Sequence, residues 1–311
     1  MLSVSHSVGH SLTVKTSGTE LATYRYAPAM EQVDSPRPYL HPVRTLAGDL
    51  VTVDSPHDHS WHRGLSWAWP NVGPHSFWGG PTFIEGQDYV QLPNNGSQLH
   101  QGFDSLEVSE AGVRLQERLT WLAAPAATGQ AGGAVVAERR DLGFGLVSGD
   151  AWWLSFDSTV TNLSGGRLDL GSPTTQGRPD AGYGGLFWRG PREFTGTGVI
   201  TTPDGVKSEE AARAWRGDWM AFTGRHDQSR RASTLLWVCH SQNPASPSEW
   251  FVRSQWWAAL CPAPFFNHVL GFEPGQDLRF RYVVLVANGE LSPSRAGSLV
   301  NQAHTLLGNM G

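Results

Sequence analysis

Short apolar runs alternate with polar breaks along the chain, and many of the runs repeat every second residue. Between residues 152 and 162, Trp152, Leu154, Phe156 and Val160 fall on one face, as in a strand with one buried side. Valine, threonine and aromatic residues, which favour strands, recur in these runs. Similar segments lie at 11–16, 20–26, 113–120, 233–239 and 277–287. The pattern predicts a mainly β protein.

The breaks between these runs are rich in turn-forming residues, because the sequence holds 36 glycines and 20 prolines. Only two segments have a helical pattern, 208–216 and 292–307, and the first offers Ser208 as an N-cap before two acidic residues. The small residues of 123–133 predict a connecting loop. We therefore expect a large antiparallel β-sandwich with few short helices, in a single domain over residues 1–311.

Composition narrows the classes of function. Net charge is −5, the arginines are scattered, and Lys15 and Lys207 are the only lysines, so no basic patch for nucleic acid is expected. No apolar run of about 18 residues predicts a membrane span, and no leader is recognisable, so we expect a cytoplasmic protein. Cys239 and Cys261 are far apart in sequence, and we expect two buried thiols rather than a disulfide.

The stretch from 37 to 69, RPYLHPVRTLAGDLVTVDSPHDHSWHRGLSWAW, is the richest in titratable residues, with four histidines and three arginines. Residues 50–53 predict a short strand that ends at Ser55-Pro56, because proline and its predecessor avoid further regular structure. Residues 57–63 would then form a loop before the apolar run 65–69. Loops held between structured segments often carry binding and catalytic groups.

The histidines of this loop allow more than one interpretation. His57 and His59 would point to the same side of an extended segment, with His62 nearby. Three imidazoles suit zinc or a similar ion, so a divalent metal on His57, His59 and His62 is one alternative. No HExxH or comparably specific pattern is present, and we predict no cofactor. Histidines that form hydrogen bonds to a ligand are the preferred interpretation, and a packed structural histidine is the plain one.

Arginines and tryptophans add further candidates. Arg37, Arg44 and Arg63 flank the histidines, and a planar guanidinium suits carboxylates, phosphates or vicinal hydroxyls. The alternative is a structural ion pair, for example between Arg63 and Asp58. Most of the tryptophans must lie in the core, but a few would suit stacking against a sugar.

Two later stretches are chemically informative. The glycine-rich segment 174–192 carries Arg178, Asp180, Tyr183 and Arg189, and a shorter stretch, EWFVR, occupies 249–253. No GxSxG, P-loop or GxGxxG pattern occurs, which gives no support to a serine hydrolase or a nucleotide-binding protein.

Four motifs, RPYLHPVRT, DHSWHRGLSWAW, GYGGLFWR and EWFVR, follow one another in this order over nearly the whole chain. Together they resemble the PmoA-like family of bacterial proteins, often labelled "methane oxygenase PmoA". The residues that match the family pattern are Arg37, Pro38, His41, Pro42, Arg44, Asp58, His59, His62, Arg63, Gly64, Tyr183, Gly185, Trp188, Arg189, Trp250 and Arg253. Trp61 departs from it, since relatives often carry a histidine there, which weakens a metal site at this position.

More distantly, an arginine before a strand and a histidine-glycine segment after it resemble the layout of aldose 1-epimerases. That likeness implies a galactose-mutarotase-like β-supersandwich. In such enzymes one histidine protonates the ring oxygen and a carboxylate removes the anomeric proton, but no motif here matches the carboxylate. PmoA-like relatives tend to occur beside sugar dehydrogenases of the Gfo/Idh/MocA type, which implies a role in carbohydrate catabolism.

We therefore expect a carbohydrate-active enzyme that acts on a sugar, keto-sugar or glycoside by acid/base chemistry, because histidine titrates near neutral pH. The reaction would be epimerisation, elimination or hydration, or glycosidic cleavage. A non-catalytic sugar-binding or regulatory module is the first alternative, and a histidine-metal-dependent lyase or hydrolase is the second. The partner would be a small carbohydrate, and a homo-oligomer is left open.

The expected site residues fall into two groups, which must converge on one pocket to serve a ligand. The catalytic candidates are His59, His62 and Asp58. The substrate-binding candidates are Arg44, Arg63, His41, Tyr183, Trp188 and Arg189.

Overall fold

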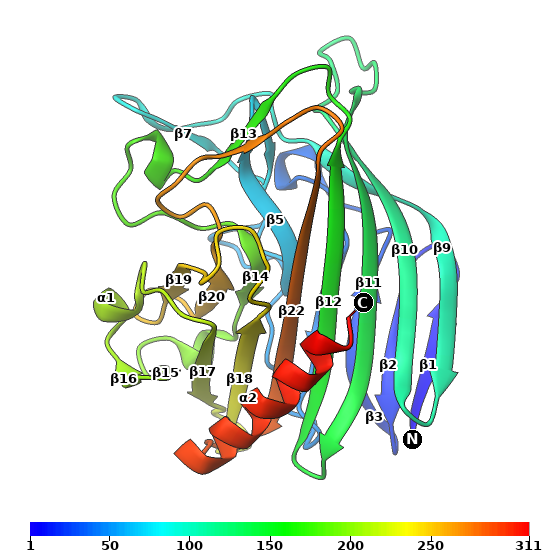
Figure 1. The fold of residues 1–311 in the computed structure, drawn as a ribbon, viewed down its shortest axis with the longest axis vertical. Helices are drawn as coiled ribbons and strands as arrows, with labels where there is room; N and C mark the ends of the chain where they lie inside the picture. The colour runs from blue at the N-terminus through cyan, green and yellow to red at the C-terminus, as the bar shows by residue number, and fades with distance from the viewer. Residues whose placement is uncertain (311) are drawn as a thin grey trace.

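Two large antiparallel sheets pack face to face in the computed structural model, which describes residues 1–310 (Figure 1). The predicted all-β sandwich with few helices is confirmed. The first sheet has eleven strands, with β1-β2-β3-β4-β5-β14-β20-β19 in order; β6 and β13 also pair with β5, and β21 pairs with β13. The second sheet has nine strands in the order β16-β15-β17-β18-β22-β12-β11-β10-β9.

The strands of the first sheet are β1 (Leu2–Ser7), β2 (Ser11–Thr16), β3 (Thr19–Arg25), β4 (Tyr39–Val43), β5 (Leu65–Val72), β6 (His75–Phe77), β13 (Leu168–Gly171), β14 (Gly185–Arg189), β19 (Trp250–Arg253), β20 (Ala259–Pro262) and β21 (Leu270–Phe272). Those of the second sheet are β9 (Ser97–Ser109), β10 (Gly112–Leu122), β11 (Ala134–Ser148), β12 (Ala151–Asn162), β15 (Val199–Thr202), β16 (Gly205–Lys207), β17 (Trp219–Arg225), β18 (Ala232–Cys239) and β22 (Asp277–Asn288). A separate hairpin pairs β7 (Thr82–Ile84) with β8 (Asp88–Val90). The helices are α1 (Glu209–Ala212), α2 (Pro293–Gly308) and the 3-10 turns η1 (Gln32–Asp34), η2 (Thr174–Gln176) and η3 (Arg192–Phe194).

Side-chain alternation along two neighbouring strands separates the core from the outer face of the first sheet. On β5, Trp67 and Trp69 enter the core between the sheets, while Ala68 faces outward. On β14, Trp188 enters the same core and Phe187 faces outward. Each large side chain buried in this way stabilises the fold by roughly 1.5–3 kcal/mol. The outward residues help form a smaller apolar cluster, on which the candidate site is built.

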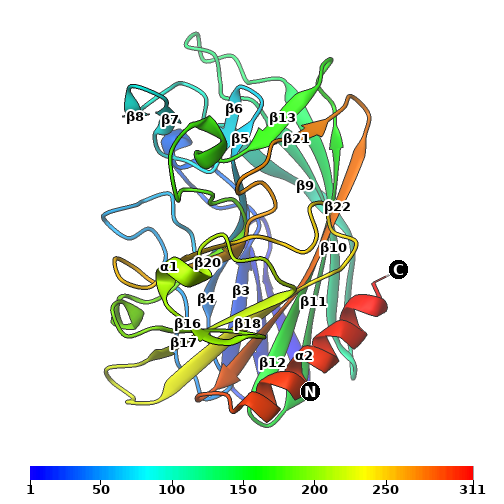
Figure 2. The same ribbon diagram turned by 60° about the vertical axis from the view of Figure 1, so that its left-hand side comes forward.

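Helix α2 lies across the outer face of the second sheet (Figure 1). Its Leu299 and Ala303 pack with Leu236 of β18 and Leu285 of β22. The predicted helix over 292–307 is therefore confirmed, with Ser292 as its N-cap. In Figure 2 the β7–β8 hairpin at the upper left and α1 below it both lie on the side of the molecule away from the C-terminus.

Two predictions were wrong in extent. The helix expected over 208–216 is reduced to the single turn of α1, because Arg213 adopts extended torsions and Ala214 has a positive φ of 59°. The strand expected over 50–53 does not form a ladder. Val51 donates to Val43 and Val53 donates to Arg189, so the segment bonds to two different neighbours and only an isolated bridge forms at Leu50.

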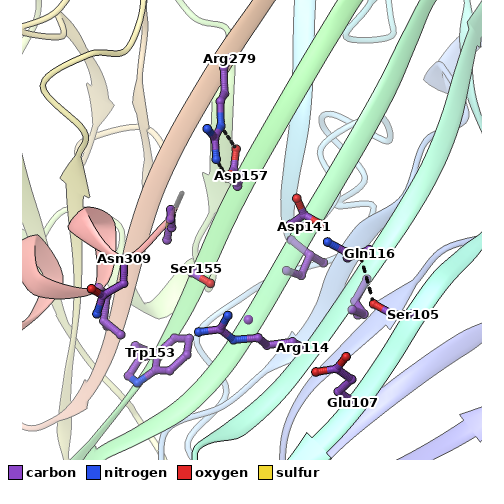
Figure 3. Close-up of a pocket in the computed structure, with 15 residues that line it drawn as sticks. Ser105, Glu107, Arg114, Gln116, Asp141, Trp153, Ser155, Asp157, Arg279 and Asn309 are labelled. Carbon is purple, nitrogen blue, oxygen red and sulfur yellow. Dashed lines mark hydrogen bonds and ion pairs between the residues drawn. The ribbon is translucent and has the colours of Figure 1, made fainter.

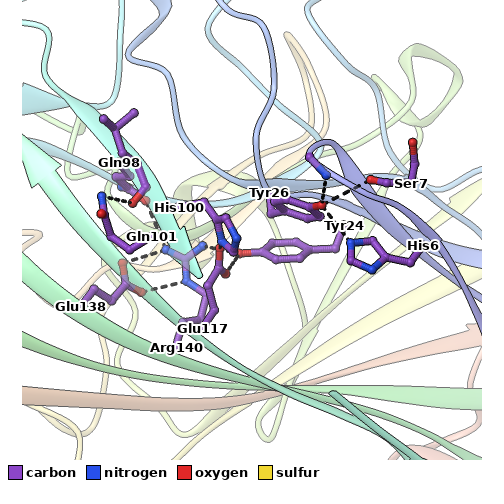
Figure 4. A network of polar contacts seen from close by, with 12 residues as sticks. His6, Ser7, Tyr24, Tyr26, Gln98, His100, Gln101, Glu117, Glu138 and Arg140 are labelled. Carbon is purple, nitrogen blue, oxygen red and sulfur yellow. Dashed lines mark hydrogen bonds and ion pairs between the residues drawn. The ribbon is translucent and has the colours of Figure 1, made fainter. Parts of the chain in front are cut away.

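A buried polar network lies inside the sandwich (Figure 4). Arg140 donates to Glu138 at 2.8 Å and to the Tyr24 hydroxyl at 3.0 Å. Glu117 accepts from Tyr24 and, at 2.6 Å, is bonded to His100. Burial raises the pKa of Tyr24 well above its ordinary value, so the hydroxyl remains a donor. Because these groups satisfy one another, the network is part of the core.

The remaining sequence predictions concern the cysteines and the membrane. Cys239 and Cys261 are buried free thiols, as predicted, and burial raises the pKa of each to about 12. Among residues 1–310 no helix is long and apolar enough to cross a membrane.

Candidate functional site

The loop that carries His59 and His62 is anchored at both ends. The His62 amide donates to the carbonyl of His59 and the Ser55 amide donates to the carbonyl of His62, which folds the loop into tight turns. At its end Gly64 has a φ of +42°, and a Cβ atom there would lie 2.1 Å from the Leu40 carbonyl oxygen. Only glycine fits this close approach to β4.

Charged residues under the loop hold it in place. Arg63 donates to Asp34 at 2.7 Å and to Asp54 at 3.2 Å, and Arg37 donates to the carbonyl of Trp61 at 2.6 Å. The proposed alternative pairing of Arg63 with Asp58 is wrong, because Arg63 binds Asp34 and Asp54 instead. Arg37 and Arg63 thus fix the loop from below.

His59 and His62 stack with their rings 4.6 Å apart and 15° from parallel. Their hydrogen bonds fix opposite tautomers. Nδ1 of His62 lies 2.9 Å from Nη1 of Arg189, which can only donate, so this Nδ1 accepts. Nδ1 of His59 lies 3.2 Å from a carboxylate oxygen of Asp58, so this Nδ1 donates. In the neutral rings, Nε2 of His59 is then an acceptor and Nε2 of His62 is a donor.

The shifts in pKa favour neutral imidazoles at His59 and His62 and an ionised carboxylate at Asp58. Burial, together with the Arg189 charge, holds the pKa of His62 well below its ordinary value. Burial also lowers the pKa of His59, although Asp58 opposes the shift. Burial acts to raise the pKa of Asp58, but the His59 hydrogen bond and the Arg189 charge outweigh it, and the pKa is lowered.

Arg189 links the two histidines, because it contacts His62 directly and also contacts Asp58, the partner of His59. Besides His62, it contacts Asp58 at 3.2 Å, and its guanidinium lies 5.2 Å from the ring centroid of Trp257. Its side chain is 1% exposed. It reaches the outer face because strand alternation turns Arg189 away from the core that Trp188 enters.

Both histidines line a cavity of about 260 Å³ on the outer face of the first sheet. No aspartate or glutamate is among its lining residues in the described chain. Trp257 lines the cavity, and its Nε1 is buried without a hydrogen-bond partner among residues 1–310. The full lining consists of His59, Trp61, His62, Trp78, Pro81, Tyr89, Arg178, Ala181, Tyr183, Phe187, Phe251, Arg253 and Trp257.

The predicted site residues are only partly brought together. His59, His62 and Tyr183 line the cavity, and Asp58 and Arg189 lie directly behind the histidines. The other predicted binding residues do not line it. His41 bonds to Thr52 and Arg44 to the Gly48 carbonyl, while Arg63 anchors the loop. Trp188 is fully buried, and its indole donates to the Val51 carbonyl.

The geometry does not suit the three-histidine metal alternative. Among residues 1–310 no three histidine, cysteine, aspartate or glutamate side chains are grouped so as to hold a metal ion. His59 and His62 are stacked rather than convergent, and Nδ1 of His57 contacts Arg192 at 3.1 Å. We derive no chemistry from a metal.

Several cavity residues were not among the predicted site residues. Arg178 and Arg253 stood in stretches that the sequence marked as informative, but nothing separated them from ordinary loop arginines. Tyr89 belongs to the β7–β8 hairpin, and its sequence context carries no signal. Phe187 was detectable only in part, as a strand residue that alternates away from the core, and Trp78 directly follows β6.

A second hollow, of about 390 Å³, lies on the outer face of the second sheet beside α2 (Figure 3). Asp141 and Asp157 face each other across β11 and β12, and Asp157 pairs with Arg279 at 2.6 Å. Burial, with the charge of Asp157, raises the pKa of Asp141. Among the described residues no histidine and no predicted site residue lines this hollow, and Trp153 is the one aromatic ring in that lining. The smaller cavity therefore remains the candidate site.

Comparison with solved structures gives remote similarities. The heparan sulfate lyase HepC from Pedobacter heparinus is 10% identical with a TM-score of 0.37, over 91% of this chain and 34% of that one. A protein assigned as a kojibiose phosphorylase, from human microbiome, is 11% identical with a TM-score of 0.27, over 96% and 32%. A protein assigned as an aldose 1-epimerase, from Klebsiella pneumoniae subsp. pneumoniae, is 9% identical with a TM-score of 0.34, over 97% and 84%. The chain thus spans about a third of the length of the first two.

Comparison of sequences assigns a family. No curated protein matches the chain. The profile of a family described as "Family of unknown function (DUF6807)" matches residues 11–301, and the match carries no information about PmoA-like proteins. Because the match covers nearly the whole sequence, the chain belongs to the DUF6807 family.

Proposed function

We propose that the protein is a carbohydrate-active enzyme that removes a proton from a carbon atom of a sugar or keto-sugar bound in the histidine cavity. The observation that carries the proposal is the pairing of tautomers in the stacked histidines. His59 offers a lone pair and His62 offers an N–H at the same cavity wall. Abstraction of a proton next to a carbonyl needs both of these groups.

In the proposed step, Nε2 of His59 takes the proton from the carbon next to the carbonyl. The electron pair of the broken C–H bond moves toward the carbonyl oxygen, and the His62 N–H donates a hydrogen bond to that oxygen. Protonation of the opposite face by water, while His59 passes its proton to solvent, gives an epimer. Departure of a group from the next carbon gives an elimination product instead.

Asp58 and Arg189 act through the histidines in this scheme. Asp58 holds His59 in the tautomer that leaves Nε2 free, and its negative charge stabilises the protonated ring. Arg189 holds His62 in the donor tautomer and opposes its protonation. Both are positioning residues, because neither lines the cavity.

The cavity walls support a sugar as the ligand. Aromatic rings such as Trp61, Trp78 and Trp257 offer faces for the C–H side of a sugar ring, and Tyr89 and Tyr183 offer hydroxyls. The volume of about 260 Å³ suits a small ligand, since drug-sized ligands occupy pockets of roughly 300–1,000 Å³. Glycosidic cleavage is less favoured than proton abstraction, because it ordinarily uses a pair of carboxylates at the reacting bond.

Hydrogen exchange with solvent tests the proposal. The full-length protein would be incubated in D₂O with a panel of aldoses, ketoses, keto-sugars and uronates, and deuterium on each carbon followed by NMR. We expect the wild-type protein to introduce deuterium at one carbon next to a carbonyl, and the His59→Ala variant to lose this activity. Ring opening alone exchanges no carbon-bound hydrogen, so mutarotation would not be mistaken for it.

The same experiment separates the alternatives. A sugar that binds without any exchange or conversion would identify a binding module and refute the enzymatic proposal. Exchange that is equal in His59→Ala would show that another group is the base.

A further inference from the structure

We propose that the ligand of the histidine cavity carries an anionic group, such as the carboxylate of an acidic sugar, and that Arg178 binds this group. The inference rests on the proposed function for the location of the ligand, and it adds the substrate class. Arg178 takes no part in the proton transfer.

The first argument is the lack of an acidic partner for Arg178. Its Nη1 donates to the hydroxyl of Tyr89, and its guanidinium lies 4.5 Å from the centroid of the Tyr89 ring. No acidic side chain among residues 1–310 forms an ion pair with it. A half-buried guanidinium has five N–H donors, so most of its capacity is left for a ligand.

The tyrosines beside Arg178 do not supply the missing negative charge. The Tyr89 hydroxyl lies 2.9 Å from the hydroxyl of Tyr183, which continues the contact along the cavity wall. Burial raises the pKa of Tyr89 and raises that of Tyr183 well above its ordinary value. Both hydroxyls therefore remain neutral at physiological pH.

Glu85 lies beside Gly177 but forms no ion pair with Arg178 among residues 1–310, and two further acids near this wall bind other arginines. Asp180, two residues further along the loop, pairs with Arg213 at 3.4 Å. Glu209 pairs with Arg213 at 2.6 Å and with Arg253 at 3.2 Å, and it also accepts from the amide of Ser254 at 2.6 Å.

On the far side of the histidines, too, two arginines lie beside one acid. Behind the histidines, Arg189 and Arg192 share the single carboxylate of Asp58.

An unpaired cation against aromatic walls is unfavourable, because it gives up part of its hydration without an ionic partner. A carboxylate on the ligand would supply that partner through charge-assisted, bidentate hydrogen bonds. A sulfate ester offers the same chemistry. A neutral sugar would leave the arginine as it is. The geometry therefore favours an acidic sugar over its neutral counterpart.

Binding measurements test this independently of turnover. Isothermal titration of the full-length protein would compare D-glucuronate and D-galacturonate with D-glucose and D-galactose, which differ from them only at the C6 group. D-glucose 6-sulfate would distinguish carboxylate from sulfate recognition. We expect an acidic sugar to bind at least about tenfold tighter than its neutral counterpart, as a charged hydrogen bond would give. The preference should shrink as salt is raised.

Variants then test whether Arg178 is the residue that binds the anionic group of the ligand. Arg178→Gln should remove the preference for the acidic sugar and leave the weak affinity for the neutral one unchanged. Arg118→Gln is the matched control. It removes the same charge from Arg118 of β10, which forms an exposed ion pair with Asp104 of β9, and it should retain the preference. If Arg178→Gln does not fold, the wild-type comparison still decides, and Arg178→Lys, which keeps the charge, provides a second variant.

The outcomes are separable from those of the proposed function. Equal affinity for acidic and neutral sugars, a preference that survives in Arg178→Gln, or no binding of any of these sugars at millimolar concentration would overturn the inference. Acidic sugars that bind through Arg178 without hydrogen exchange would uphold the inference and refute the proton abstraction. Exchange on neutral sugars alone would do the reverse.

Discussion

Two regions of the molecule place charged side chains among aromatic rings, and they differ in whether those side chains find partners within the protein. In the network between the sheets, Arg140 is bonded to Glu138, Tyr24 and Gln98, and Glu138 also accepts from Trp121 at 2.7 Å. Every charge there has its partner inside the protein. Such a network stabilises one arrangement of the core and offers nothing to a ligand.

The histidine cavity leaves groups open instead. Each stacked imidazole has one nitrogen committed to the protein and one without a partner among the described residues. Arg178 lacks an acid, and the Trp257 indole lacks an acceptor in the same part of the chain. Unsatisfied groups gathered at one cavity lower stability, and their presence together indicates a ligand.

The same comparison excludes a third histidine. His226 lies 2.6 Å from a carboxylate oxygen of Glu193 and 2.7 Å from the hydroxyl of Ser233, an order of residues that resembles a catalytic triad. Ser233 is completely buried, and none of the three residues lines the candidate cavity. A nucleophile must reach its substrate, so this group belongs with the structural network.

The largest expected effect is a loss of stability when the buried network around Arg140 is broken. Arg140→Met should lower the free energy of unfolding by about 3–5 kcal/mol, because it leaves Glu138 charged and unpaired in the core. Urea denaturation measures this. Arg118→Met, which breaks an exposed ion pair, is the control and should change stability by less than about 1 kcal/mol. A loss of under 1 kcal/mol in Arg140→Met would show that the network is not stabilising.

The next effect is on the cavity. His59→Ala should slow hydrogen exchange on the substrate by about 100-fold to 10,000-fold, the usual contribution of a general base. Its unfolding free energy should change little, because His59 is a partly exposed loop residue. Rate and stability measured on the same preparation would test both halves. Lost cooperative unfolding in this variant would instead assign His59 to the structural group.

A smaller effect is expected on the pH dependence of the unfolding free energy, through the buried His62 of the cavity. His62 is buried and neutral, and its folded pKa lies below that of the unfolded chain, so unfolding takes up a proton in acid. Its contribution to stability is complete above the unfolded pKa of about 6.5 and is lost as pH falls below that value, by at most about 1.4 kcal/mol per pH unit. Denaturation from pH 7.5 to 5 should show this slope, and His62→Gln should reduce it. An equal slope in the variant would contradict the assignment.

The smallest effect concerns Arg178. Without ligand, Arg178→Gln should leave the unfolding free energy within about 0.5 kcal/mol of the wild-type value or raise it slightly, since the arginine has no acid to lose. Arg140→Gln in the network is the opposite case and should be strongly destabilising. A large stability loss in Arg178→Gln would place this arginine among the structural groups.

Sequence alone determined the fold class and the main chemical segment. Period-two runs such as 113–120 and 277–287 became β10 and β22, because alternation reflects one buried face and is a local property. The histidine loop was located for a similar reason, since Pro56 and Gly64 mark its ends in the sequence. The length of the helix after Ser208 could not be read from the local sequence, because the extended torsions of Arg213 and the positive φ of Ala214 end α1 early.

Tertiary structure decided which candidates share a site. Trp188 and Arg189 are adjacent, yet one lies in the core and the other reaches the histidines, because neighbouring residues of β14 face opposite sides of the sheet. Arg178, Tyr89 and Trp257 come from three distant segments, and no sequence spacing relates them. The tautomers of His59 and His62 depend on which partner each Nδ1 meets. The sequence determines which polar and charged groups the chain contains, but only the packing of the sheets and loops determines which of them are left without a partner.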